Sequence, residues 1–132
     1  MLRINKENRI ANKIKGLLNK KGFIVRTQYS KNTKSVYLTI DNGACGVIRI
    51  SDHKRANTTS KYNVVKGYKG RKKEFVNGKV AIYYNFNHVN RLLADLEIER
   101  SNKVLRYGYS NYKNIRDGLT NANNLEYARN AA

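Results

Sequence analysis

Two alternating segments that flank an Asn-Gly pair constrain the fold of this chain more than any other feature. Residues 35–40 (SVYLTI) and 44–51 (ACGVIRIS) alternate apolar and polar side chains, as strands with one buried face do. Asn42-Gly43 lies between them, and this pair suits a type I′ turn because both of its central residues need positive φ. Residues 23–29 (FIVRTQY) form a third segment rich in strand-forming residues. We therefore predict an antiparallel three-stranded meander over 23–51.

Two amphipathic segments predict helices on either side of this meander. Apolar residues recur with helical spacing over 5–21, and Gly22 follows where a helix commonly ends. The same spacing returns over 87–100, where Asn87 can cap the first turn. A further strand is predicted over 80–86. The remaining residues, 103–132, are predicted to form a tail that ends in a short helix over 119–129.

This order of elements predicts an α+β fold in a single domain over 1–132. We expect an antiparallel β-meander of three to five strands, with two or three helices packed against it, because this arrangement buries both apolar faces. The opposite face of the sheet carries Tyr37, Thr39 and Arg49, and we expect it to be open to a partner.

The net charge points to the kind of partner. The chain carries 27 Lys and Arg against 9 Asp and Glu, which gives a formal net charge of +18 on 132 residues. Solubility needs a net charge of only about 2–8 in a small domain. A polyanion such as DNA, RNA or a nucleoprotein is the partner that this excess favours.

The excess is densest over 53–75, which we predict to be a long basic loop with a short strand around Tyr62. Its cations can neutralise phosphates together, and Tyr62 and Tyr68 are placed to stack on unpaired bases. We expect contacts that position the protein on phosphates rather than contacts that read base sequence. The predicted contact residues are Lys54, Arg55, Lys61, Tyr62, Lys66, Tyr68, Lys69, Arg71, Lys72 and Lys73, together with Arg9 and Lys13 on the first helix.

Neither catalysis nor a metal centre is predicted. No phosphate-binding glycine motif occurs, and Asp52-His53 with His88 does not supply the three or four convergent ligands that a metal needs. Cys45 is the only cysteine, so no internal disulfide can form. No apolar run suggests a secretory signal or a membrane span. We therefore expect a cytoplasmic, non-enzymatic protein without cofactors that binds no membrane.

One pattern resembles a known group. The strand end over 47–53 (VIRISDH), Lys-Tyr at 61–62, Asn-Gly-Lys-Val at 77–80 and the following amphipathic helix resemble small phage-encoded proteins that include anti-CRISPR inhibitors of type II-A effectors. The likeness spans roughly residues 22–105. It implies a non-catalytic inhibitor that binds an RNA-guided type II CRISPR nuclease with its guide RNA, in the cytoplasm of the host bacterial cell. The inhibitor would block DNA binding or cleavage.

Two other classes fit the same residues. A DNA- or RNA-binding accessory protein of a phage or mobile element would carry a similar charge. A ribosome-associated structural protein also fits the charge, but the ten tyrosines fit that class less naturally. Binding to free duplex, compared with binding to a nuclease–RNA complex, separates the first of these from the inhibitor.

Overall fold

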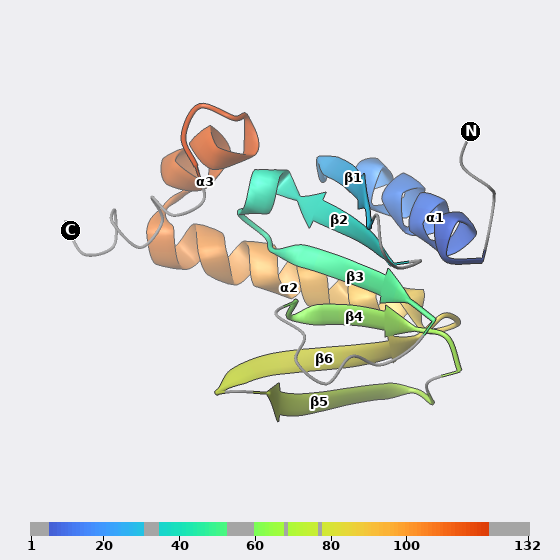
Figure 1. The fold of residues 1–132 in the computed structure, drawn as a ribbon. Coiled ribbons are helices and arrows are strands. Elements are labelled where there is room, and N and C mark those ends of the chain that lie inside the picture. The colour runs from blue at the N-terminus through green and yellow to red at the C-terminus, as the bar shows by residue number, and fades with distance from the viewer. Residues whose placement is uncertain (1–5, 31–34, 53–59, 68, 77, 122–132) are drawn as a thin grey trace.

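The computed structural model describes residues 6–30, 35–52, 60–67, 69–76 and 78–121 (Figure 1). Within these residues three α-helices, six strands and one 3₁₀ turn follow one another along the chain. They are α1 Lys6–Lys20, β1 Val25–Tyr29, β2 Val36–Ile40, the turn η1 Asp41–Gly43, β3 Val47–Ser51, β4 Tyr62–Val65, β5 Arg71–Val76, β6 Lys79–Asn85, α2 Val89–Tyr107 and α3 Tyr109–Arg116.

The strands form one sheet in the order β1-β2-β3-β4-β6-β5. The first three strands are the predicted antiparallel meander, and β5 and β6 form a second antiparallel pair. β4 is parallel to both of its neighbours, β3 and β6. The α+β class is therefore as predicted, but the antiparallel sheet of three to five strands is not: the described sheet is mixed and has six strands. Parallel pairing needs a crossover, which no local sequence pattern reveals.

The described part of the predicted loop over 53–75 contains β4 and most of β5. The short strand expected around Tyr62 is β4, whose four residues (YNVV) are all buried. β5 (RKKEFV) was not predicted, because lysines are uncommon in strands and only an edge position tolerates so many. The turn after β2 also differs from a tight hairpin. Asp41 and Asn42 have the positive φ angles of 52° and 54°, but β3 begins at Val47 rather than at Ala44.

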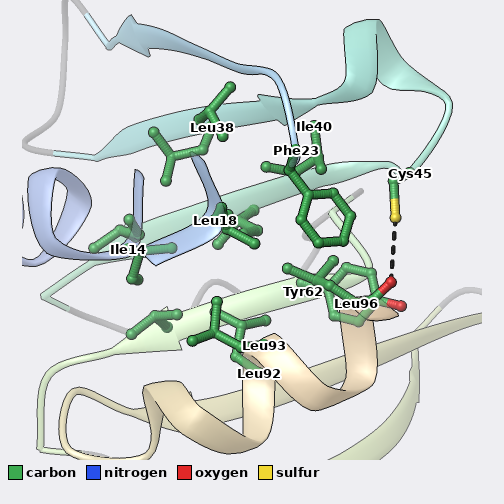
Figure 2. Packing of buried hydrophobic residues seen from close by; sticks show 14 of the residues in the cluster. Ile14, Leu18, Phe23, Leu38, Ile40, Cys45, Tyr62, Leu92, Leu93 and Leu96 are labelled. Carbon is green, nitrogen blue, oxygen red and sulfur yellow. Dashed lines mark hydrogen bonds between the residues drawn. The ribbon is translucent and has the colours of Figure 1, made fainter. Parts of the chain in front are cut away.

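α1 and α2 pack on the same face of the sheet, where the main hydrophobic core lies (Figure 2). Leu18 of α1 and Leu96 of α2 are completely buried and belong to one cluster with side chains of β2 and β3, among them Leu38. Burial of each such side chain contributes about 1.5–3 kcal/mol to the free energy of folding, compared with leaving it exposed to water. The helix predicted over 5–21 corresponds to α1, and this packing explains its apolar stripe.

α2 is longer than the sequence pattern predicts. It begins at Val89, one residue after His88, and runs past the expected end at residue 100 to Tyr107. Asn87 does not cap it: its backbone N–H donates to Asn85 Oδ1 at 2.8 Å instead. The predicted tail therefore contains the end of α2 and all of α3, while the helix expected over 119–129 lies almost entirely outside the described residues. None of the described helices is long and apolar enough to cross a membrane.

A buried carboxylate ties the ends of several elements together. Asp41 is completely buried in η1, and its Oδ1 accepts the backbone N–H of Ile24 at 2.9 Å. Its Oδ2 accepts Nε and Nη2 of Arg100 at 3.1 and 2.9 Å and the hydroxyl of Tyr112 at 2.5 Å. Arg100 also lies 3.7 Å from the centroid of the Phe23 ring. This cluster anchors α2 and α3 to the start of β1.

Cys45 lies beside this cluster and packs as a small apolar residue. Its thiol is completely buried and donates to the carbonyl of Leu96 at 3.5 Å (Figure 2). Burial, followed by the charge of Asp41, raises the thiol pKa from 9.0 to about 12. The thiol therefore stays protonated at neutral pH, and the thiolate that would act as a nucleophile does not form.

Candidate nucleic-acid interface

Four of the eight acidic side chains in the described part of the chain are paired with cations that lie far away in the sequence. Each of these pairs engages one carboxylate, which therefore does little to neutralise the cations elsewhere on the surface. Asp41 is paired with Arg100 as described above. The three acids of α2 form the pairs Lys21–Glu97 at 3.0 Å, Lys61–Glu99 at 3.2 Å and Arg71–Asp95 at 2.8 Å.

β5 lies at one edge of the sheet (Figure 1). Exposed lysines lie along it and in the connection that leads to it from β4. Lys73 is opposite Ile82 in the register, on the face that the helices cover, while Lys72 is opposite Tyr83 on the other face. Positive charge is therefore presented on both sides of the edge. We call this surface the basic corner, and it consists of Lys66, Lys69, Lys72, Lys73 and Lys79. The first four lie before β5 or in its first half, whereas Lys79 lies beside its last residue.

Edge protection alone does not account for this surface. Lysines on an edge strand discourage pairing with the sheets of other molecules, and this effect is sufficient to explain Lys72 and Lys73. Lys66 and Lys69, however, lie in the connection between β4 and β5, where no sheet edge needs protection. Lys72 is the only member with an acid partner among the described residues, Glu74 at 3.4 Å, and its side chain is 64% exposed. The other four members therefore have no acid partner among the described residues.

The start of β5 is held in place by Asp95 of α2. Its Oδ2 accepts Nε of Arg71 at 2.8 Å and the hydroxyl of Tyr84 at 2.5 Å. Arg91, one turn earlier on α2, lies 3.6 Å from Oδ1. Burial raises the pKa of Tyr84, and its hydrogen bond to Asp95 raises that pKa further. The phenol therefore remains a donor at neutral pH, and β5 has a fixed position from which its lysines project.

Several predicted contact residues lie at the basic corner, and others have a different environment. Lys66, Lys69, Lys72 and Lys73 belong to the corner as defined above. Arg71 is exposed but paired with Asp95, and Lys61 is paired with Glu99. Lys54, Arg55 and Tyr68 lie outside the described residues.

The structure corrects the role predicted for Tyr62. Its side chain is 2% exposed and packs in the main core, so the ring is not available to stack on a base. Burial is also the main reason why the pKa of its phenol is raised. The sequence predicts that residue 62 belongs to a basic loop, but in the structure it begins strand β4 and its side chain points toward α2.

The basic flank of α1 is separate from the basic corner. Arg9 and Lys13 are exposed on α1, as predicted. α1 packs on β1, β2 and β3. β2 and β5 are four strand positions apart, which corresponds to about 19 Å at 4.8 Å per strand. The basic flank of α1 and the basic corner can therefore contact the same ligand only if that ligand spans at least about 19 Å.

The face of the sheet opposite the helices is not the open surface that the sequence suggests. Arg49 is 2% exposed, and its Nη2 donates to Ser51 Oγ at 3.1 Å. Asn63 and Tyr83 on the same face are completely buried. Tyr37 and Thr39 are only half-buried. The centre of this face is therefore filled, and contact with a partner is limited to its margins.

Lys79 belongs to the basic corner but is absent from the predicted contact residues. It is the first residue of β6 and is opposite Val76 of β5 in the register. The Asn77-Gly78 turn is the sequence feature that could have placed it there, because a hairpin brings the residue after the turn beside the preceding strand.

The described residues contain no group of three His, Cys, Asp or Glu side chains that could hold a metal ion. Asp52 and His88 are both exposed, and His53 lies outside the described residues. Catalysis and metal binding therefore gain no support from side-chain geometry in this part of the molecule.

Comparison with models of known protein families, with curated proteins and with solved structures finds no match for this chain. The case for a function therefore depends on the basic corner and on the sequence pattern described above.

Proposed function

We propose that this protein is a non-catalytic binder of nucleic-acid backbone, and that the basic corner is its contact surface. The single observation that supports this proposal is the separation of charge. The acids of α2 are paired within the chain, while five lysines gather at one edge of the sheet. Each phosphate that such a lysine neutralises releases condensed counterions, which favours binding and makes the affinity depend on salt.

We further propose that the target is an RNA-guided type II CRISPR nuclease with its guide RNA, and that binding blocks the loading or cleavage of DNA. The support for this target is the resemblance of residues 47–53, 61–62 and 77–80 to phage-encoded anti-CRISPR proteins. Ile48, Ile50 and Tyr62 in these segments are core residues, so the resemblance concerns the fold more than the contact surface. Such an inhibitor would act in the cytoplasm of the infected bacterium.

The charge of the protein limits where it can bind on such a nuclease. The channel that holds the RNA–DNA heteroduplex is itself positive, so an empty channel repels a protein with a net charge of +18. Exposed guide-RNA backbone, bound DNA or an acidic protein patch are the surfaces that attract it. We favour exposed guide-RNA backbone because the basic corner is rich in lysines, which suit phosphate contacts without base readout.

A second candidate is a DNA- or RNA-binding accessory protein of a phage or mobile element. The observation that favours it is the same lysine-rich corner, because contacts to phosphate alone do not distinguish guide RNA from free duplex. Binding measurements separate the two candidates. Tight binding to free duplex DNA supports the accessory protein, whereas binding only to the nuclease–guide complex supports the inhibitor.

Fluorescence anisotropy tests the contact surface. The variant Lys72→Gln/Lys73→Gln should weaken binding to the labelled target about tenfold and lower the slope of log K against log salt by about 1.5, because two phosphate contacts are lost. The control variant Lys20→Gln/Lys113→Gln removes the same charge from α1 and α3. At 0.1 M salt charges more than about 10 Å apart are screened, so the control should bind almost normally. Equal losses in both variants would rule out the basic corner as the contact surface.

A further inference from the structure

A cavity of about 330 Å³ lies between the start of β4 and the C-terminal half of α2. The side chains around it are predominantly polar, and most come from successive turns of α2. It lies on the side of the sheet that the helices cover, since Lys61 reaches across it to Glu99. The lining residues are Lys61, Glu99, Asn102, Lys103, Arg106 and Tyr107. We call this cavity the α2 pocket.

The α2 pocket has three cations and one carboxylate in its lining, Lys61, Lys103 and Arg106 against Glu99. Glu99 is already engaged by Lys61, whose Nζ donates to both carboxylate oxygens at 3.2 and 3.3 Å. Lys103 and Arg106 have no acid partner among the described residues. The Arg106 guanidinium is 5.6 Å from the centroid of the Tyr107 ring. The pocket therefore keeps an excess of positive charge that its own carboxylate does not cancel.

The helix dipole explains part of this arrangement but not all of it. Cations in the last turn of a helix interact favourably with its C-terminal carbonyls, and Arg106 lies in the last turn of α2. The dipole does not account for Lys61, which comes from the start of β4, or for a concave surface that brings the three cations together. Concave sites with a few convergent polar groups are typical of ligand binding.

The α2 pocket is also close to the basic corner. Tyr62, next to Lys61, is opposite Ile82 in the sheet, and Ile82 is opposite Lys73. Two strand spacings, about 10 Å, therefore separate the backbone at the edge of the pocket from the backbone of Lys73. Lys73 is on the same side of the sheet as the pocket, so one strand of nucleic acid can reach both.

We propose that the α2 pocket is a phosphate site that takes one nucleotide of a single-stranded segment bound along the basic corner. This inference rests on the proposed function. The cations would contact the phosphate, and the Asn102 amide offers both a donor and an acceptor to the base or sugar. A single strand is favoured over a duplex because a nucleotide enters a pocket of this size only when it is free of stacking and pairing.

Charge variants with matched controls test the pocket. Arg106→Gln and Lys103→Gln should each weaken binding of a labelled single-stranded RNA about five- to tenfold and lower the salt slope by about 0.7. The control Lys20→Gln removes the same charge from α1 and should change the affinity less than twofold. Circular dichroism of each variant confirms that the fold is retained. Equal effects of Arg106→Gln and Lys20→Gln would overturn the proposal.

A substitution of opposite sign makes the test sharper. Glu99→Gln removes the only carboxylate among the described residues that line the pocket, so it should strengthen RNA binding about threefold or more. Glu97→Gln adds the same charge two residues away on α2, where side chains do not face the same direction, and serves as the control. Weaker binding by Glu99→Gln, or an equal gain in Glu97→Gln, would contradict a phosphate site at this position.

Direct probes separate the possible sources of the phosphate. In NMR spectra the single-stranded RNA should shift the side-chain amide signals of Asn102, while a mononucleotide should do so only at much higher concentration and inorganic phosphate more weakly still. A mononucleotide that binds as tightly as the strand would refute the proposed strand contact. If Lys72→Gln/Lys73→Gln loses binding and the pocket variants bind normally, the phosphate site in the α2 pocket is refuted while the basic corner remains supported as the contact surface. Failure of every probe to bind would refute both proposals.

Discussion

Asp41→Asn is expected to be among the most destabilising conservative substitutions in this protein. The carboxylate is completely buried and accepts hydrogen bonds from Ile24, Arg100 and Tyr112. An asparagine has one acceptor oxygen, so its NH₂ group must face some of these donors. The change adds no backbone strain, because asparagine tolerates the positive φ of 52° found here. The effect therefore measures the polar cluster itself.

The magnitude follows from the contacts that are lost. A hydrogen bond to a charged group contributes about 1.5–3 kcal/mol, and breaking a fully buried ion pair costs about 3–5 kcal/mol. The Arg100 side chain is 24% exposed and can recover some hydration, which places the expected loss near the lower end of this range. We expect a loss of about 3 kcal/mol in the free energy of unfolding and a fall in Tm of about 10 °C.

Urea unfolding followed by far-ultraviolet circular dichroism measures this loss. Asp117→Asn is the matched control: Asp117 is exposed at the end of α3, 3.3 Å from Arg116, and its pair should contribute less than about 1 kcal/mol. A double-mutant cycle with Arg100→Met should give a coupling energy of about 2 kcal/mol, because both residues belong to one cluster. A loss below about 1 kcal/mol for Asp41→Asn, or additive effects in the cycle, would refute this account of the cluster.

Three other predictions concern stability. Burial raises the pKa of Cys45 from 9.0 to about 12, so the protonated thiol makes its full contribution to stability below pH 9 and loses it as the pH rises toward 12. The free energy of unfolding, measured across this range, should therefore decline with pH. The decline should be smaller in the variant Cys45→Ala. Leu96→Ala should cost about 2–5 kcal/mol in urea unfolding, whereas Leu105→Ala, at a side chain that is 85% exposed on the same helix, should change stability by less than about 0.5 kcal/mol. Tyr84→Phe removes the hydroxyl that donates to Asp95, so it should lower the free energy of unfolding by about 1 kcal/mol and speed hydrogen exchange of the β5 amides. Unchanged exchange would show that this hydrogen bond does not hold β5 at the edge of the sheet.

The elements with strong local patterns were predictable. The apolar stripe of α1 and the alternation of β2 and β3 correspond closely to the observed elements, because each buries one face against the same core. The prediction failed where the local pattern and the tertiary environment disagree. β5 has the composition of a loop and becomes a strand only because β6 provides a partner for its backbone. The end of α2 lacks a continuous apolar stripe and is fixed by Gly108, whose φ is 90°.

The contact surface was predictable only in part. The sequence identified a basic segment and four lysines of the basic corner, but it did not separate them from neighbours with other roles. Tyr62 and Arg49 were predicted to lie on the surface and are buried, because side chains on a strand alternate between two faces and both faces are covered at these positions. The α2 pocket was not predicted, because Lys61 and Arg106 come together only through the packing of α2 on the sheet.

The sequence by itself determined the α+β class, the antiparallel meander, the first helix and the excess of positive charge. These properties depend on local periodicity, on turn residues and on composition, which need no knowledge of distant contacts. The tertiary structure decided the parallel pairing of β4, the edge position of β5 and the pairing of the acids of α2 with Lys21, Lys61 and Arg71. These depend on contacts between residues that are far apart in the chain. The charge of +18 was therefore known from the sequence, but the surfaces that carry it were set by how the chain packs.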